Sequence, residues 1–237
     1  MKNHSAFRKA LAWSVHAFTA SGIIFAFLAI LAIQAHEYVN VFLYLSIAFF
    51  IDGIDGTFAR AVRVKEVLPN FSGDSIDHVI DFTTYAVIPA YFLYETELLP
   101  SNLAFFGICV LLLTSCYYYG KLTYITHDLH FEGFPVLWNF VAFYMFFFFD
   151  FSQMANFIII MIVAVLHFIP WKYPYPSRTK ELRIPTFIIF GFILAAAVYA
   201  LYYYPEKPLW IDITGYVSLI YFFGITIYKT YFWKGWN

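Results

Sequence analysis

Charged side chains are scarce in this sequence. Lysine, arginine, aspartate and glutamate together make up 12% of the 237 residues, whereas about 25% is usual in soluble proteins. Apolar residues make up 62% of the chain and aromatic residues 24%. A soluble domain of this length could not cover so much apolar surface with polar groups. The composition therefore excludes a soluble globular protein and indicates that most of the surface faces lipid.

Cysteine and clusters of basic residues are also nearly absent. The two cysteines, Cys109 and Cys116, lie seven positions apart in one apolar segment, too far along a helix for a disulfide. We expect them to be packing residues. The sequence has no histidine and cysteine pattern suited to zinc. Its net charge of -1 comes without a basic patch, so nothing indicates nucleic acid as a partner.

Long apolar segments take the place of the missing polar surface. A bilayer core of about 30 Å needs about 20 apolar residues in helical form. The runs are continuous rather than alternating, which excludes the strands of a membrane β-barrel. The sequence predicts an all-α, polytopic membrane helical bundle, a single domain over residues 1–237 with about eight transmembrane helices. The expected spans are 11–34, 39–60, 76–98, 103–120, 134–150, 155–171, 184–204 and 212–232.

The basic residues are distributed unevenly between the ends of these spans. Thirteen of the fourteen lie on one side of the predicted topology, and Lys207 alone lies on the other. Because positive residues near span ends stay in the cytoplasm, both termini are expected there. The first apolar run is long and begins late, so we expect it to be a retained span and not a cleaved signal.

Acidic residues are few, but one third of them are clustered. Five of the fifteen fall within thirty positions, at the ends of the second and third spans. An aspartate at the centre of a membrane helix costs about 2.5–3.5 kcal/mol on insertion scales, so several together need a compensating partner. A divalent cation is the natural one. The five are Asp52, Asp55, Asp74, Asp77 and Asp81.

The spacing of these acids places them in pairs. Residues three or four apart share a helix face, so Asp52 points with Asp55, and Asp77 with Asp81. Asp74 could join the second pair, because it lies three positions before Asp77. Two facing helices that each offer carboxylates, without histidine or cysteine, suit Mg²⁺ or Mn²⁺. A structural cation site, or an ion pathway in a transporter, is the alternative reading of the same acids.

Small residues and one arginine accompany the acids. Gly56 and Ala59 leave room for another backbone or a bulky polar ligand to approach the helix. Arg60 follows at the cytoplasmic end, where its planar guanidinium could meet a phosphate. Gly73 opens the third span, and free amide groups at a helix N-terminus favour a phosphate. The pattern therefore predicts a phosphate-bearing ligand next to the metal site.

These residues carry a resemblance to a known family. The sequence reads Asp52-x-x-Asp55-Gly56-x-x-Ala59-Arg60 and, after twelve residues, Gly73-x-x-x-Asp77-x-x-x-Asp81, which resembles the signature of the CDP-alcohol phosphotransferases. The twelve-residue gap is longer than usual in that family. It resembles the branch that contains the bacterial phosphatidylcholine synthases, as do two further stretches, Phe131-Glu132-Gly133-Phe134-Pro135-x-x-Trp138-Asn139 and Tyr175-Pro176-Ser177-Arg178-Thr179.

The resemblance implies a role for each motif residue. Asp52, Asp55 and Asp77 would bind two divalent ions, Mn²⁺ or Mg²⁺, that hold the diphosphate of a CDP-linked lipid. Asp81 would be the general base and is also a candidate metal ligand. The remaining motif positions would contact the cytidine and phosphates of the donor, together with Asp55: Gly56, Ala59, Arg60 and Gly73. The first six spans, about 11–171, would form the catalytic core, with two added helices at about 184–232.

The branch resemblance also implies an acceptor and a location. It suggests transfer of a phosphatidyl group from CDP-diacylglycerol to choline, on the cytoplasmic face of a bacterial inner membrane, by a protein that could be a homodimer. Arg178 and Lys180 could hold a donor phosphate or simply set the topology. Choline would be recognised by aromatic faces and a carboxylate, and the candidate residues are Glu132, Phe134, Trp138 and Asn139.

Two other functions fit the same residues. Within the family, the acceptor could be serine, glycerol 3-phosphate or inositol phosphate, although a phosphorylated acceptor would require more basic residues near the site than the sequence offers. Outside it, the chain could be a cation-coupled transporter of a quaternary amine. Release of CMP that depends on choline would distinguish the enzyme from the transporter.

Overall fold

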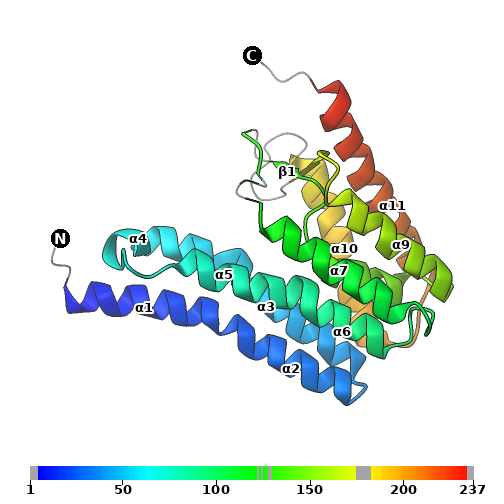
Figure 1. The fold of residues 1–237 in the computed structure, drawn as a ribbon, viewed down its shortest axis with the longest axis horizontal. Helices are drawn as coiled ribbons and strands as arrows, with labels where there is room; N and C mark the ends of the chain where they lie inside the picture. Colours follow the sequence, from blue (N-terminus) through cyan, green and yellow to red (C-terminus); the bar gives the residue numbers. More distant parts are fainter. Residues whose placement is uncertain (1–4, 122, 124, 128–129, 175–182, 234–237) are drawn as a thin grey trace. The chain divides into compact units, whose positions relative to one another are not determined.

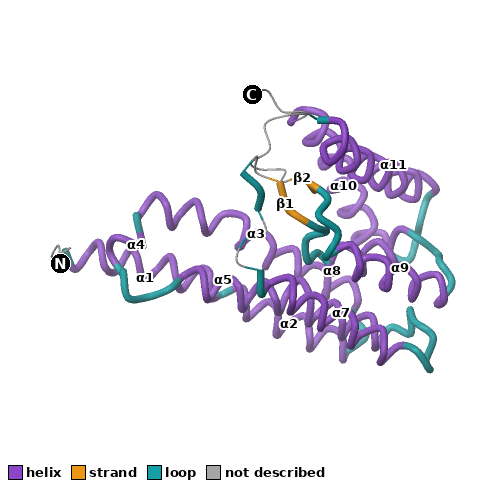
Figure 2. Tube along the Cα trace, turned by 45° about the horizontal axis from the view of Figure 1, so that its top comes forward, coloured by secondary structure: helices purple, strands orange, loops and turns teal. Residues whose placement is uncertain are grey.

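The computed structural model describes residues 5–121, 123, 125–127, 130–174 and 183–233. Nearly all of its regular structure is helical, and Figure 2 shows the one pair of short strands in the described part of the chain. The chain divides into two compact units, Met1–Tyr91 and Phe92–Asn237. We refer to them as the first and the second unit and describe each by itself.

The first unit consists of long helices that lie side by side. Helices α1 (Ala6–Ala20) and α2 (Gly22–Gln34) follow one another almost without a break, and α3 (Tyr38–Val62) runs back along both of them (Figure 1). A short helix α4 (Val64–Val67) follows, and α5 (Gly73–Phe82) then packs against α1. The aspartates of α3 and α5 therefore belong to neighbouring elements of one unit.

Helix α5 continues through a π-helical turn. The turn, η1 (Thr83–Val87), leads directly into α6 (Ile88–Glu95), which contains Pro89. Proline has no N–H and crowds the preceding turn of a helix, and a π-turn is one way in which a helix accommodates such a defect. The Thr84 hydroxyl bonds to the Ile80 carbonyl at 3.0 Å and so satisfies a backbone acceptor in the widened region.

Packing in the first unit has the character of a membrane protein. Small residues such as Ala26, Ala29 and Ala48 are buried where helices meet, which allows close approach of their backbones. Large apolar side chains such as Phe27 and Phe50 are instead mostly exposed. Lipid, rather than other protein, is the natural partner for these exposed side chains.

In the part of the chain that the structure describes, the second unit contains the end of α6, five further helical segments and a small sheet. The helical segments are α7 (Ala104–Tyr119), α8 (Trp138–Phe143) with the π-turn η2 (Tyr144–Phe148), α9 (Gln153–Leu166), α10 (Arg183–Tyr203), and α11 (Leu209–Ile227) with the π-turn η3 (Tyr228–Phe232). Strands β1 (His130–Glu132) and β2 (Lys172–Pro174) pair antiparallel, with Phe131 opposite Tyr173. Helix α7 packs on α9, and α10 on α11.

One end of the second unit is held together by contacts between its turns. The Gln153 side chain donates to the Glu97 carbonyl at 2.8 Å. Lys207 forms ion pairs with Asp150 at 2.8 Å and Asp212 at 2.9 Å. Burial alone lowers the pKa of Lys207, but the hydrogen bonds to the two carboxylates outweigh it and raise the pKa. Residues 97, 150 and 207 therefore mark a common end, the turn end.

Other contacts define the opposite end. Lys121 donates to the His167 carbonyl at 3.1 Å, and the Lys172 amide donates to the Thr230 hydroxyl at 2.9 Å. Strands β1 and β2 lie here as well. We call this the strand end. The five helical segments of the second unit thus run alternately between the turn end and the strand end.

The structure confirms the prediction of an all-α membrane bundle. A helix occupies each of the eight expected spans, and among the described residues four helices are long and apolar enough to cross a membrane: Ala6–Gln34, Tyr38–Val62, Ile184–Tyr203 and Leu209–Phe232. Three further apolar helices are shorter, and the segment from Gly73 to Glu95 contains the motif acids. Cys109 and Cys116 are free, as expected, but Cys116 is exposed, so the prediction that both are packing residues is wrong for Cys116.

Candidate metal and nucleotide site

Three aspartates from α3 and α5 converge in the first unit. One carboxylate oxygen each from Asp52, Asp55 and Asp77 lies within 4.8 Å of the others. Asp55 is buried, with 7% of its surface exposed, and the other two are half-buried. The i, i+3 spacing on α3 presents its two carboxylates on one face of the helix, where they meet the carboxylate of Asp77 from α5. The grouping on facing helices thus agrees with the sequence prediction for these three residues.

The donor set of this cluster suits a divalent cation. Three carboxylates held this close repel one another strongly in a medium of low dielectric constant, unless a positive charge lies between them. Oxygen ligands alone are the preferred set for hard ions such as Mg²⁺ and Mn²⁺. The residues present therefore fit a bound divalent ion.

The other two acids of the cluster behave differently. Asp81 lies outside the group of three, and its Oδ1 atom is buried without a hydrogen-bond partner among the described residues. Asp74, the other candidate for the α5 face, instead forms an exposed ion pair with Lys65 at 2.7 Å. The structure therefore separates a group of three acids, a half-buried acid with one enclosed oxygen, and an ion pair at the surface.

A tyrosine that the sequence analysis missed holds one of the three acids. The Tyr85 hydroxyl donates to Asp52 Oδ2 at 2.7 Å, and Tyr85 is 5% exposed. It lies four residues after Asp81, so the spacing that pairs Asp77 with Asp81 also extends to it. This four-residue spacing could have identified Tyr85 from the sequence, whereas nothing in the sequence indicated the π-turn that carries it.

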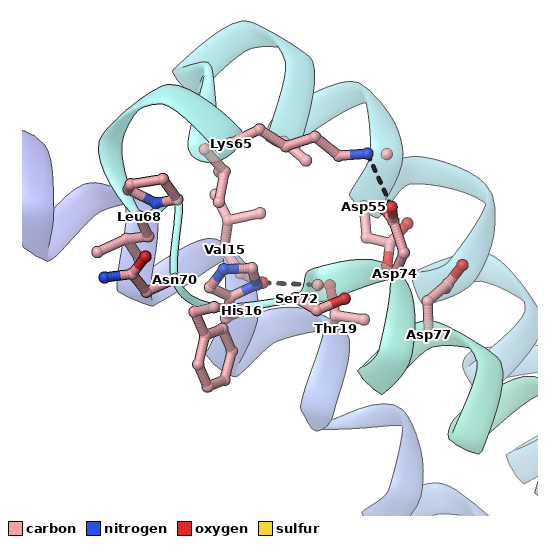
Figure 3. A pocket seen from close by; sticks show the side chains of 16 residues that line it. Val15, His16, Thr19, Asp55, Lys65, Leu68, Asn70, Ser72, Asp74 and Asp77 are labelled. Carbon is pink, nitrogen blue, oxygen red and sulfur yellow. Dashed lines mark hydrogen bonds and ion pairs between the residues drawn. The ribbon is translucent and has the colours of Figure 1, made fainter.

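A pocket of about 460 Å³ opens beside the three acids (Figure 3). Five motif positions line it: Asp55, Gly56, Ala59, Gly73 and Asp77. The rest of its wall comes from α1, from residues 64–65 and 68–72 of the connection between α3 and α5, and from Asp74. Its size is within the range of pockets that bury small ligands, about 300–1,000 Å³. The sequence prediction of a ligand site next to the acids thus coincides with a cavity.

The two glycines of the motif each lie close to a particular side chain. A Cβ atom on Gly73 would lie 2.7 Å from Cε1 of His16, so any other residue where α5 begins would have to displace the His16 ring. A Cβ atom on Gly56 would lie 3.2 Å from an Arg60 guanidinium nitrogen. Arg60 itself is exposed and donates to the Thr57 hydroxyl at 3.0 Å. Arg60 is therefore near Gly56 but is not part of the pocket lining.

The four predicted acceptor residues lie in the second unit. Glu132 is exposed on β1, opposite Lys172 in the sheet. Phe134 is half-buried, and its ring centroid lies 5.3 Å from that of Tyr173. These two side chains retain surface that a ligand could reach.

Trp138 and Asn139 are enclosed. Trp138 is completely buried, and its indole N–H donates to the Ser115 hydroxyl at 2.8 Å. Asn139 is 7% exposed, and its Oδ1 atom lacks a hydrogen-bond partner among the described residues. Arg178 and Lys180, the predicted phosphate-binding residues, lie outside the described residues.

Sequence comparison identifies relatives along most of the chain, although no family model matches it. The chain is 39% identical over 214 residues to a phosphatidylcholine synthase of Agrobacterium fabrum. This alignment covers 90% of this chain and 88% of that protein. It is 37% identical to the phosphatidylcholine synthase of Rhizobium meliloti, with the same coverage. For the phosphatidylcholine synthase of Pseudomonas aeruginosa the identity is 33%, over 94% of this chain and 93% of that protein.

The spaced aspartates, the glycines beside them and the membrane bundle that holds them define the class of protein, a CDP-alcohol phosphotransferase. Proteins of this class are generally dependent on divalent metal ions, which agrees with the acidic cluster. Within the class, identity of 33–39% along most of the length decides the branch. The chain belongs to the phosphatidylcholine synthase family.

Proposed function

We propose that this protein transfers the phosphatidyl group of CDP-diacylglycerol to choline and releases CMP. The observation that carries the proposal is the convergence of Asp52, Asp55 and Asp77 beside a pocket that is also lined by the small motif residues Gly56, Ala59 and Gly73. The relatives' name, phosphatidylcholine synthase, supports the choice of product. No other cluster of three or more metal-ligating acids, histidines or cysteines occurs in the described part of the chain.

In this proposal the three clustered aspartates hold two divalent ions, Mn²⁺ or Mg²⁺. A bound divalent ion supplies charge neutralisation on the donor's diphosphate and on the departing CMP. Gly56, Ala59 and Gly73 leave space for the nucleotide in the pocket. Arg60, close by on α3, contributes a positive charge at its rim.

Asp81 is the proposed general base. Its buried Oδ1 has no hydrogen-bond partner among the residues described here, so the carboxylate can accept a proton. The choline hydroxyl oxygen attacks the phosphorus that carries the lipid, its proton passes to Asp81, and the bond between that phosphorus and CMP breaks. In the same proposal Asp81 is also a candidate metal ligand.

The proposal includes a location and an orientation. The motif contains Arg60, and Arg63 and Lys65 follow it in the connection to α5, so this concentration of basic residues favours the cytoplasmic side. The relatives are bacterial proteins, which favours an inner membrane. The family resemblance suggests a homodimer. Size-exclusion chromatography with light scattering on the purified protein tests that assembly, and a monomer mass would exclude it.

The decisive experiment measures CMP release by purified protein. With CDP-diacylglycerol and Mn²⁺ we expect release only when choline is added, and none in excess chelator. Asp81→Asn should lower kcat by about 10²–10⁴-fold, the usual contribution of a general base, while CMP still binds. Asp150→Asn, the same substitution at the turn end of the second unit, should leave kcat unchanged.

Three outcomes would oppose parts of the proposal. CMP release with serine or glycerol 3-phosphate, but not with choline, would change the acceptor. Full activity in excess chelator would exclude the metal. Uptake of choline by proteoliposomes that lack CDP-diacylglycerol, without CMP release, would favour a transporter.

The acceptor pocket is proposed to involve residues 131–139. Because Trp138 is enclosed, its role there would be to hold the segment, while Glu132 and Phe134 would meet the quaternary ammonium. Glu132→Gln and Phe134→Leu should each raise the KM for choline by about threefold to tenfold, equivalent to a loss of about 0.7–1.4 kcal/mol. The KM for CDP-diacylglycerol should not change. An unchanged KM for choline in both variants would remove this segment from the acceptor site.

A further inference from the structure

The motif residues account for only part of the pocket in the first unit. Much of the remaining wall is formed by the twelve-residue connection between Arg60 and Gly73. This connection contains α4 and then Leu68, Pro69, Asn70, Phe71 and Ser72, all of which line the pocket. The long connection therefore builds a wall of the ligand site.

His16 on α1 faces this wall. It lines the pocket, is 5% exposed, and its Nε2 atom is buried with no hydrogen-bond partner among the described residues. Its ring centroid lies 4.7 Å from that of Phe71 and 5.9 Å from that of Trp13. Leaving a buried polar atom unbonded is costly. An unbonded nitrogen in a ligand pocket is therefore best explained by a bond to the ligand.

The pocket has two chemically different ends (Figure 3). Asp55, Asp74 and Asp77 gather at one end, while His16 and Asn70 lie at the other, with Lys65 reaching across the top. In the proposed function the acidic end holds the metal and the donor's diphosphate. The opposite end then faces the part of the nucleotide farthest from the reacting phosphorus, which is the base.

A pyrimidine base requires a flat apolar surface and a polar edge. Aromatic side chains supply the first by stacking, and Phe71 is an aromatic ring at this end of the pocket. The second requires a donor directed at the ring nitrogen of the base, and His16 supplies it in the tautomer in which Nε2 carries the proton. Cytosine presents an unprotonated ring nitrogen at this edge, whereas uracil presents an N–H in its place.

We propose that the end of the pocket formed by His16 and the long connection binds the cytosine of the donor nucleotide, and that His16 is a residue that determines specificity for that base. The inference rests on the proposed function, because it takes the acidic end as the diphosphate site. It adds a base-reading residue that lies thirty-six positions before the first motif aspartate. Gly73 contributes to the same base-binding site, because the His16 ring occupies the space that a Cβ atom on Gly73 would need.

The test compares CMP with UMP on the full-length protein in detergent with Mn²⁺. Binding is measured by the shift in melting temperature with nucleotide concentration, and independently by competitive inhibition of the transferase. His16→Phe keeps an aromatic ring between Trp13 and Phe71 but removes the nitrogen. His16→Gln keeps a polar group of similar reach. His127→Phe, at an exposed position of the second unit, is the matched control.

We expect wild-type protein and His127→Phe to bind CMP more tightly than UMP. His16→Phe should weaken CMP about tenfold, as expected for one lost hydrogen bond in a buried site, and leave UMP nearly unchanged. His16→Gln should recover part of the preference. If His16→Phe does not fold, the comparison of His16→Gln with wild type decides, because it should reduce the preference for CMP without abolishing it.

The opposite results are equally clear. CMP binding by His16→Phe at the wild-type level, or an equal loss for CMP and UMP, would overturn the inference. Because melting shifts require no acceptor and no turnover, they separate the two proposals. Suppose that the wild-type protein binds CMP more tightly than UMP but forms no CMP from CDP-diacylglycerol when choline is added. That result would reject the proposed function, whereas the proposed cytosine site would still hold.

Discussion

At the scale of single residues, the contact between Tyr85 and Asp52 is the one most open to test. The tyrosine hydroxyl donates to Oδ2 at 2.7 Å and so fixes the direction of a carboxylate that the proposal assigns to the metal. Groups that orient a metal ligand typically contribute about 10–100-fold to metal affinity or activity. Tyr85→Phe should therefore raise the Mn²⁺ concentration for half-maximal activity at least tenfold, measured by titration of the metal-free enzyme.

The ring of Tyr85 is retained in that variant, so the melting temperature should change little. Tyr44→Phe on α3 is a matched control and should leave the Mn²⁺ requirement at the wild-type value. If Tyr85→Phe lowers kcat at every Mn²⁺ concentration without shifting the titration, then the hydroxyl does not act through the metal.

At the scale of helices and turns, the sequence predicted what depends on local pattern. Apolar runs identified the helices, and the spacing of three and four residues paired Asp52 with Asp55 on one face. Gly73 was expected to open a helix and is the first residue of α5. Each of these features depends on residues within one or two helical turns of one another.

Features that depend on distant contacts could not be predicted in this way. The span expected from residue 134 begins at Trp138, because residues 130–132 pair with 172–174 as strands. Between them Gly133 adopts a φ of 82° and lies against the His167 carbonyl, where a side chain would not fit. The partnership of His16 with Gly73 joins positions fifty-seven residues apart. No periodic pattern indicates such a contact.

At the scale of the whole molecule, the open question is how many helices cross the membrane. Helix α7 has 16 residues, which at about 1.5 Å per residue is roughly 24 Å, less than a bilayer core of about 30 Å. Yet in the second unit α7, α8 with η2, and α9 run between the same two ends as the long helices α10 and α11. If the long helices of this unit cross the membrane, the short ones beside them should cross it too.

Labelling of single cysteines tests this directly. The background for labelling is a variant in which both native cysteines are replaced, Cys109→Ala and Cys116→Ala. Into it, Ser101→Cys or Glu206→Cys places a single thiol at the turn end, and His127→Cys places one at the loop that leads to β1.

The basic residues of the second unit predict which end is cytoplasmic. Lys121, Lys172 and Lys229 gather toward the strand end, and Lys207 at the turn end is neutralised by two carboxylates. The positive-inside rule therefore assigns the strand end to the cytoplasm. In intact cells a membrane-impermeant maleimide should label positions 101 and 206, and position 127 only after permeabilisation. Labelling of 206 but not of 101 in intact cells would mean that an odd number of the intervening helical segments cross the membrane, against the four required for eight spans.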